Sequence, residues 1–119
     1  LRHSIPGFTS WAIFGIIFLN RKNINDENGR NTLNHEWGHT QQEEQIGTLS
    51  YIVNIALPSV VNMIKGTGDY YSQPWERSAD YLGGVDRGNY TEGSLVRANA
   101  YLRNSRQYGV LYPLIRIFQ

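Results

Sequence analysis

The sequence contains no cysteine, which excludes a disulfide framework and any metal site built on thiolate ligands. It also carries little net charge, +1 with histidine neutral, so it lacks the strong basic patch that is typical of nucleic-acid-binding proteins. Histidine is scarce, with three in 119 residues. Hydrophobic residues make up 40% and aromatic residues 13%, a composition that favours a globular chain with a buried core. We therefore expect residues 1–119 to form a single domain that does not bind nucleic acid.

A long uninterrupted hydrophobic run is missing as well. Residues 46–64 are strongly apolar, but Asn54, Pro58, Ser59 and Asn62 interrupt them. A membrane-spanning helix needs about 20 predominantly apolar residues, so a membrane is not the expected partner. We expect instead a helix, a break near Pro58 and a second short helix. A membrane-associating segment built on these residues is a weaker alternative.

Two of the three histidines lie in residues 35–39, which read His-Glu-Trp-Gly-His and match the H-E-x-x-H pattern of zinc hydrolases. On a helix, His35 and His39 lie one turn apart on one face, where both imidazoles can bind one metal ion. Glu36 follows the first histidine and can reach a water molecule beside the ion, which is the place of a general base. The sequence therefore predicts a zinc site with His35 and His39 as ligands and Glu36 as a catalytic residue.

A catalytic zinc site usually has three protein ligands and one open position. Glu76 is the best candidate for the third ligand, because Pro74 suits the first turn of a helix that would carry it. Asp80 follows four residues later on the same face, where it can accept a hydrogen bond from the far nitrogen of a ligand histidine. The alternative interpretation makes Glu76 an ordinary residue of a first helical turn and Asp80 a surface carboxylate paired with Arg77 or Arg87.

Three other residues are rival ligands. His3 lies near the start of the chain, where residues are often poorly ordered. Glu43 and Glu44 follow His39 on the motif helix, and Glu43, one turn beyond His39, could support a ligand rather than be one. Ligands spaced at i, i+4 and i+8 on one straight helix diverge too far to close a tetrahedral site easily, so Glu76 is preferred.

Hydrolysis of a carbonyl group develops an oxyanion that needs a hydrogen-bond donor. Tyr70 and Tyr71 lie in the loop that leads into the Glu76 helix, so both are expected near the metal. Tyr71 is taken as the second catalytic residue, with Tyr81 and Arg87 as alternative donors. Structural packing of the ring is the other interpretation for each tyrosine.

The remaining segments predict the fold. Residues 10–20 are rich in β-branched and aromatic residues and predict a strand, either in the core or at an edge beside the metal, where a peptide could pair. The motif helix is expected from about residue 30 to about residue 46, with Trp37 packed in the core. Residues 94 to about 106 predict another helix and residues 109–118 an edge strand. We expect the α+β class, with the motif helix and a second, Glu-bearing helix packed against a short β-strand region.

Several of these segments together resemble a known family. Residues 35–42 (HEWGHTQQ), the proline-containing apolar stretch, the two tyrosines of residues 70–71 and residues 75–84 (WERSADYLGG) look like the C-terminal domains of some bacterial Rhs-repeat polymorphic toxins. Those domains are similar to small zincin-type metallopeptidases of the gluzincin kind. The likeness covers roughly residues 8 to 90.

The resemblance implies that His35, His39 and Glu76 are the zinc ligands, that Glu36 is the general base, and that Asp80 is the acidic residue four positions after the ligand glutamate. It also implies a zincin-like fold and a secreted effector or toxin that is delivered into a target cell and held in check by an immunity protein. The chain begins without methionine and has no signal-peptide pattern, so we expect the C-terminal part of a longer polypeptide. A gluzincin cleft usually lies between two subdomains, whereas no second subdomain is visible in this sequence.

The sequence therefore predicts a zinc-dependent metallopeptidase that acts on a protein or peptide, with zinc-activated water as the nucleophile and Glu36 as the general base. The alternative is a catalytically inactive, metal-stabilised binding or interaction module, whose site would be closed by four protein ligands. An open coordination position would distinguish the first from the second.

Overall fold

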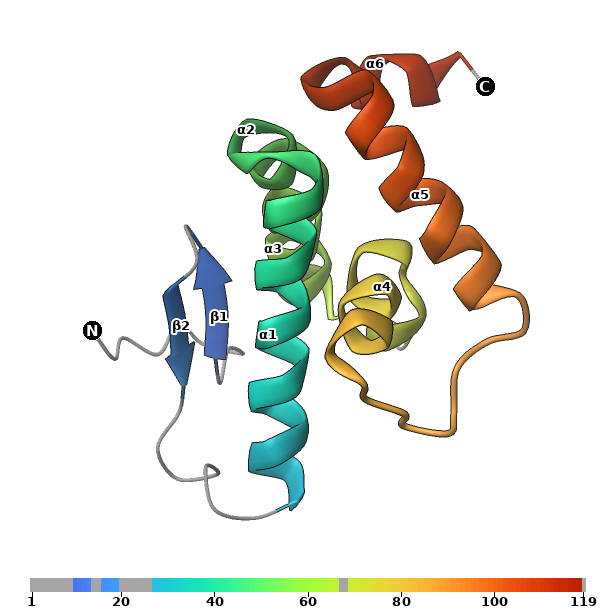
Figure 1. Ribbon diagram of the computed structural model, residues 1–119. Coiled ribbons are helices and arrows are strands. Elements are labelled where there is room, and N and C mark those ends of the chain that lie inside the picture. Colours follow the sequence, from blue (N-terminus) through green and yellow to red (C-terminus); the bar gives the residue numbers. More distant parts are fainter. Residues whose placement is uncertain (1–9, 14–15, 20–26, 67–68, 119) are drawn as a thin grey trace.

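The computed structural model describes residues 10–13, 16–19, 27–66 and 69–118. Helices account for most of this part of the chain (Figure 1). In chain order they are α1 (Glu27–Ile46), α2 (Thr48–Tyr51), the π-helical turn η2 (Ile52–Ala56), α3 (Leu57–Lys65), the 3-10 turn η3 (Tyr70–Ser72), α4 (Pro74–Gly83), α5 (Ser94–Tyr108), the 3-10 turn η4 (Gly109–Leu111) and α6 (Tyr112–Ile117). The helices expected around residues 35–39, from residue 74 and from residue 94 are confirmed.

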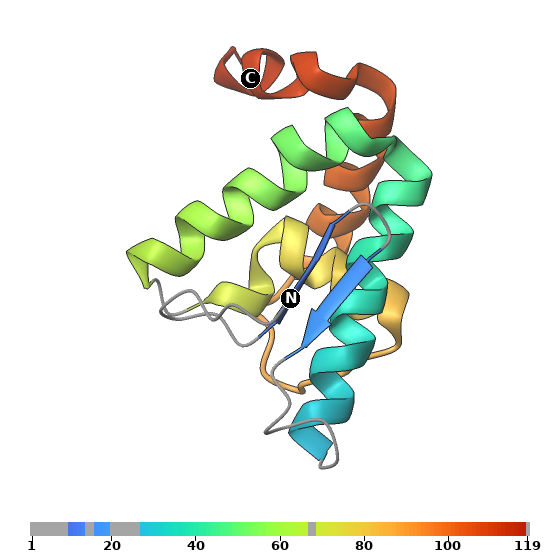
Figure 2. The ribbon, with the colours of Figure 1, turned by 90° about the vertical axis from the view of Figure 1, so that its left-hand side faces the viewer.

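A single strand over residues 10–20 was the wrong expectation. Two short antiparallel strands, β1 (Ser10–Ile13) and β2 (Ile16–Leu19), pair with Ser10 opposite Leu19 and Ile13 opposite Ile16. This hairpin packs along α1, on the side away from α4 (Figures 1 and 2). Two strands of four residues are too short to form a layer of the domain.

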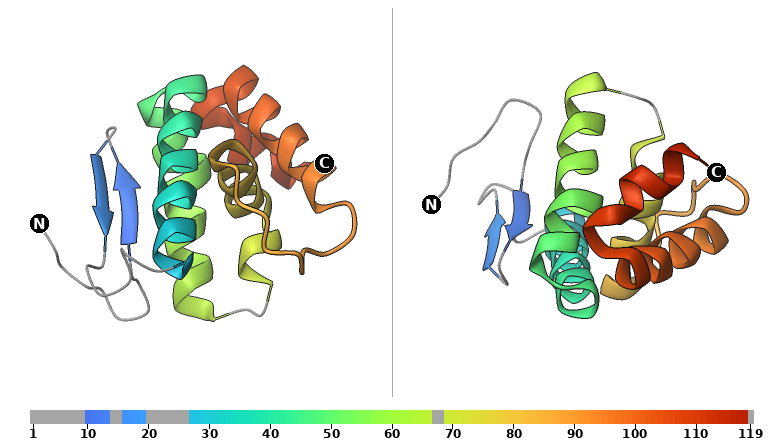
Figure 3. Two further views of the ribbon diagram at one scale, coloured as in Figure 1. Left: turned by 60° about the horizontal axis from the view of Figure 1, so that its bottom comes forward. Right: turned by 90° about the horizontal axis from the view of Figure 1, so that it is seen from above.

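The α+β expectation is overturned, because the described chain is a helical globule with the hairpin at its outside (Figure 3). Residues 109–118, expected to be an edge strand, form η4 and α6 instead. Pro113 lies in the first turn of α6, where its missing N–H breaks no helical hydrogen bond. Tyr112 and Ile115, three residues apart, pack toward the core while Leu114 and Ile117 are exposed, which is helical rather than alternating periodicity.

The apolar segment of residues 46–64 does not break near Pro58. Helical backbone continues from Tyr51 through η2 into α3, and Pro58 lies in the first turn of α3. The irregularity is the π-helical turn that precedes this proline. α3 then ends at Gly66, whose φ of 66° is the left-handed conformation that glycine adopts readily. Within the described residues, no helix combines the length and the apolar character that crossing a membrane requires.

Two glycines allow α1 and α4 to touch. A Cβ atom at Gly38 would collide with the carbonyl oxygen of Ala79 on α4, and a Cβ atom at Gly83 would collide with that of Asn34 on α1. The two helices therefore meet backbone to backbone, and α5 covers the other side of α4 (Figure 1). This close approach brings the first turn of α4 within side-chain reach of the motif residues on α1.

The apolar core lies beyond the C-terminal end of α1, where α2, η2, α5 and α6 meet. Its buried members are one aliphatic residue from α1, one from η2 and three tyrosines: Ile46, Ile55, Tyr51, Tyr101 and Tyr112. The hydroxyl of Tyr101 donates a hydrogen bond to the backbone oxygen of Asn54 at 2.7 Å, so a polar group inside this core is satisfied.

The buried face of α1 is polar. His35, Glu36, His39 and Gln42 are each 5% exposed or less, whereas Trp37 is 51% exposed. Packing of Trp37 in the core was therefore the wrong expectation, because the motif face and not the tryptophan face turns toward α4. Burial of so many polar side chains requires that they satisfy one another.

Candidate metal centre

Three side chains from two helices converge at the contact of α1 with α4. His35 and His39 come from α1 and Glu76 from the first turn of α4. Both imidazole Nε2 atoms face the same carboxylate oxygen, Glu76 Oε1, at 2.9 Å from His35 and 3.0 Å from His39. One ligand atom from each residue lies within 4.8 Å of the others. The structure thus brings together the three residues that the sequence predicts as metal ligands.

Local structure explains this convergence. The two histidines are one helical turn apart, and their rings meet edge to face with 4.6 Å between centroids. Pro74 starts α4, which places Glu76 in its first turn, where the helix dipole favours a carboxylate. Because Gly38 carries no side chain between the two histidines, α4 can approach closely enough for Glu76 to reach both rings.

The far nitrogen of each imidazole is held by an oxygen acceptor. Nδ1 of His35 donates to Asp80 Oδ1 at 2.6 Å, and Nδ1 of His39 donates to Gln42 Oε1 at 2.7 Å. Gln42 is fully buried, and its own amide nitrogen donates to the backbone oxygen of Trp75 at 2.9 Å, which orients the amide. With a proton held on each Nδ1, an Nε2 atom that releases the proton it shares with Glu76 can offer its lone pair to a metal ion. Sequence reasoning predicted Asp80 in this role but missed Gln42.

Asp80 is itself fixed by two residues from the loop after α4. Arg87 donates to Asp80 Oδ2 from Nε at 2.8 Å and to Oδ1 from a terminal nitrogen at 3.3 Å. The hydroxyl of Tyr90 donates to Asp80 Oδ2 at 2.8 Å, and the guanidinium of Arg77 lies over the Tyr90 ring at 3.8 Å. Arg87 therefore supports Asp80, and Tyr90 is a further supporting residue that the sequence analysis did not find.

The second oxygen of Glu76 has its own donor. Ser59 on α3 donates to Glu76 Oε2, and its oxygen lies 3.1 Å from the hydroxyl of Tyr70. Ser59 counted in the sequence only as an interruption of an apolar run. A polar residue occupies this position because this face of α3 packs against the buried carboxylate of Glu76. The presence of a polar residue within the apolar segment was the sequence signal that could have indicated this contact.

Glu36 and Tyr71, the predicted catalytic residues, both border the centre. Glu36 is buried beside His35 on α1. Tyr71 is 36% exposed, and its ring meets that of His35 edge to face at 5.4 Å. The guanidinium of Arg87 lies over the Tyr71 ring at 3.5 Å from the ring centroid. Tyr51 was not considered, yet its ring lies 6.2 Å from that of His39.

The alternative candidates lie elsewhere. Glu43 accepts a hydrogen bond from Thr48 at 2.9 Å, and Glu44 is exposed. Tyr81 is 54% exposed on α4, and among the described residues no hydrogen bond joins it to a ligand residue. His3 lies outside the described residues. Among the described alternatives, none makes a better third ligand or donor than Glu76 and Tyr71.

Electrostatics couple the candidate ligands tightly. Burial alone would raise the pKa of Glu76, but the two histidines hold that pKa well below its usual range. Burial alone would lower the pKa of His35, but its hydrogen bonds to Asp80 and Glu76 raise it to about 10. In the absence of a metal ion, His35 thus keeps a proton between two carboxylates. A metal cation could replace that positive charge at the same place, with release of the proton.

Burial, and next the negative charge of Glu36, raise the pKa of Tyr51 above its usual value. Burial likewise raises the pKa of Tyr71, although the nearby Arg87 opposes the shift. Both phenols therefore stay protonated at neutral pH and can act as hydrogen-bond donors.

The donor set suits zinc. Two imidazole nitrogens and one carboxylate oxygen are the ligands of many catalytic zinc sites, and they leave one coordination position for water or substrate. Among the described residues, the hydrogen-bond partner of both buried Nε2 atoms is Glu76. Comparison of this chain with protein-family models, with curated proteins and with solved structures found no match. Its function is therefore inferred from the residues of the centre themselves.

Proposed function

We propose that this chain is a zinc-dependent metallopeptidase of the gluzincin kind. The observation that carries the proposal is the convergence of two Nε2 atoms on one oxygen of Glu76, while Asp80 and Gln42 hold the opposite nitrogens. A glutamate follows the first histidine directly, which distinguishes this set from a chance cluster of ligands. The likeness of the motifs to zincin-type toxin domains supports the same reaction class.

A zinc ion held by His35, His39 and Glu76 would polarise a substrate carbonyl and lower the pKa of a water molecule. The carboxylate of Glu36 would take the proton of the attacking water and later donate it to the leaving amine. The hydroxyl of Tyr71 would donate a hydrogen bond to the oxygen of the scissile carbonyl as negative charge develops there. Arg87 holds the Tyr71 ring in place for this task.

The proposed substrate is a protein or peptide. By the resemblance of its motifs, the domain would act as a secreted effector that is delivered into a target cell, with an immunity protein as a further partner. Partial exposure of Tyr71 next to His35 supports an approach for the substrate from the η3 side of the centre.

The test separates metal binding from turnover. We expect Glu36→Gln to keep about one zinc per chain but to lose peptide hydrolysis, because only the proton acceptor is removed. Glu76→Ala should lose zinc and activity together. Elemental analysis and a peptide-library digestion followed by mass spectrometry measure the two properties. Hydrolysis by Glu36→Gln at the wild-type rate would exclude the mechanism.

One observation favours a second candidate, a metal-stabilised binding module without turnover. The ligand residues are almost inaccessible, with His35 4%, His39 5% and Glu76 0% exposed. A structural zinc site is closed, whereas a catalytic one keeps an open position. Cobalt substitution distinguishes them, because an added small anion or hydroxamate should change the visible spectrum of an open site and leave that of a closed site unchanged.

A further inference from the structure

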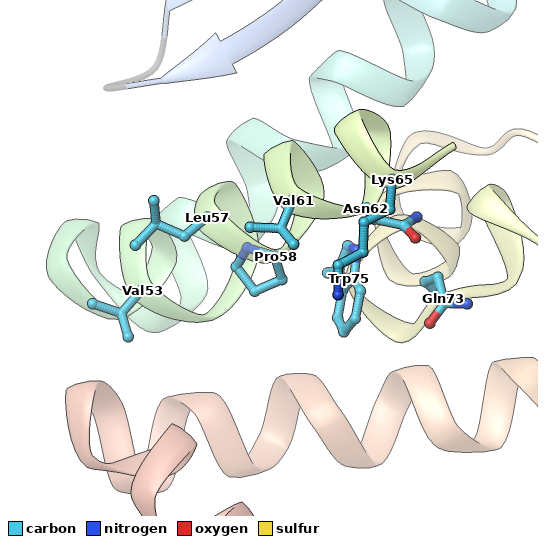
Figure 4. A pocket seen from close by; sticks show the side chains of 8 residues that line it. All are labelled: Val53, Leu57, Pro58, Val61, Asn62, Lys65, Gln73 and Trp75. Atoms are coloured by element: carbon cyan, nitrogen blue, oxygen red, sulfur yellow. The ribbon is translucent and has the colours of Figure 1, made fainter. Parts of the chain in front are cut away.

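A second candidate site lies on the side of α3 that does not carry Ser59. Leu57, Pro58 and Val61 line a hollow there of about 500 Å³, and the ring of Trp75 forms a further wall (Figure 4). Leu57 and Val61 are one turn apart, whereas Ser59 between them faces Glu76 from the other side of the helix. The hollow is therefore separate from the metal centre, although both border the start of α4.

The volume of the hollow lies in the range of ligand pockets. Small-molecule sites typically enclose about 300–1,000 Å³ and combine apolar walls with a few polar groups. Leu57 is 54% exposed and Val61 is 48% exposed, so the described chain leaves these apolar side chains uncovered. Burial of their surface by a ligand would be favourable.

The two ends of the hollow differ in chemistry. Val53 and Leu57 lie at one end, and Lys65 and Gln73 lie at the other, with Trp75 between them (Figure 4). The ammonium of Lys65 forms no ion pair with another described residue. The site is thus apolar at one end and offers a cation with an amide donor at the other.

We propose that this hollow binds a carboxylate that carries an aliphatic chain. The carboxylate lies between Lys65 and Gln73, and the chain lies along Val61 and Leu57. Eight residues of helix separate Val53 from Val61, a rise of roughly 12 Å, so a chain of eight to ten carbons fits the apolar part. A free fatty acid of this length has this chemistry. The proposal depends only on the residues that line the hollow and not on the proposed peptidase activity.

The indole N–H of Trp75 reports binding directly. The chain has three tryptophans, so a spectrum of the 15N-labelled, zinc-supplied protein shows few indole signals, and Trp75→Phe identifies the relevant one. We expect a saturable shift of this signal with decanoate below its micelle concentration, and binding by decanol that is at least tenfold weaker. A Leu-Leu-ended peptide and its C-terminal amide form the second arm, and binding of the peptide more tightly than decanoate would overturn the fatty-acid assignment.

Lys65→Met tests the charge while it keeps the aliphatic stem. We expect decanoate to bind this variant about tenfold more weakly, with decanol unchanged. Arg106→Met, on α5 and outside the hollow, is the matched control and should bind decanoate like wild type. Leu57→Asp should abolish binding of both compounds. A Trp75 signal that responds to no carboxylate, that responds equally to decanol, or that is unaffected by Lys65→Met would overturn the proposal.

Discussion

The candidate metal centre and the apolar core are equally hidden from solvent but are held together in different ways. Glu76 and Ile55 are both 0% exposed. Two imidazoles and a hydroxyl surround Glu76, whereas Ile55 packs among apolar and aromatic side chains. Loss of one partner at the centre leaves a buried polar group without compensation, while loss of a methyl group in the core leaves a cavity.

This difference shows that the candidate centre requires a particular side chain at each position, whereas the core requires that its volume be filled. Substitutions at the centre should act mainly on zinc affinity, and substitutions in the core mainly on the free energy of unfolding. The contact of α1 with α4 is the exception, since it positions the ligands and also joins the helices. The following experiments, from the largest expected effect to the smallest, test this separation.

The contact of α1 with α4 at Gly38 should be the position most sensitive to substitution. We expect Gly38→Ala to lower the free energy of unfolding by about 3 kcal/mol or more and to abolish zinc binding, because the new Cβ would collide with the backbone of Ala79. Gly66→Ala is the matched control. Gly66 has open space around it and the left-handed conformation with a φ of 66°, so that change should cost only about 1–2 kcal/mol and spare zinc. Thermal melts and elemental analysis give both values, and equal effects of the two variants would contradict the close-contact explanation.

In the core, Ile55→Ala should lower the free energy of unfolding by about 2–5 kcal/mol through the cavity that it leaves. Zinc bound per folded chain should stay at the wild-type value, because Ile55 belongs to the apolar core cluster and not to the hydrogen-bonded group around Glu76. Urea denaturation measures the first quantity and zinc titration of the native protein the second. A folded Ile55→Ala protein that has lost zinc would show that the two regions are not separable.

The side-chain amide of Gln42, which orients His39, should contribute more to zinc affinity than to the free energy of unfolding. We expect Gln42→Leu to weaken zinc binding about 10–100-fold, because Nδ1 of His39 loses its acceptor. Gln41→Leu changes the neighbouring side chain in the same way but removes no contact to a ligand, and it should bind zinc like wild type. Competition with a chromophoric chelator measures both affinities. If Gln42→Leu matched Gln41→Leu, orientation of His39 would not contribute.

Arg87 should have the smallest effect of the four. Arg87→Met removes two hydrogen bonds from Asp80, but Tyr90 still donates to the same carboxylate. We therefore expect zinc affinity to fall about tenfold at most. Arg97→Met is the control, because it removes an exposed arginine side chain that donates a hydrogen bond to Thr91 and not to Asp80. A loss as large as that of Gln42→Leu would mean that Tyr90 cannot hold Asp80 alone.

Much of the centre could be predicted because helix geometry is local. The four-residue spacing of the histidines and the position of Pro74 two residues before Glu76 require no knowledge of the fold. Gln42, three residues after His39, was within reach of the same reasoning, since side chains at that spacing are neighbours on a helix.

The fold class could not be read from the same patterns. Residues 109–118 carry many β-branched and aromatic side chains, which suit a strand, yet packing of Tyr112 and Ile115 against the core selects a helix. Short apolar segments carry no intrinsic preference strong enough to resist such contacts. The same holds for residues 10–13 and 16–19, which pair as two short antiparallel strands beside α1.

The sequence by itself determined which side chains share a helical face: the two histidines with the glutamate beside them, and Glu76 with Asp80. Only the tertiary structure decided that these faces meet, that Ser59 and Tyr90 complete the hydrogen bonds, and that the tryptophan of the motif stays in solvent. The physical reason is distance along the chain. A helical turn relates residues three or four apart, whereas Glu76 reaches His35 across 41 residues through a backbone contact that two glycines permit.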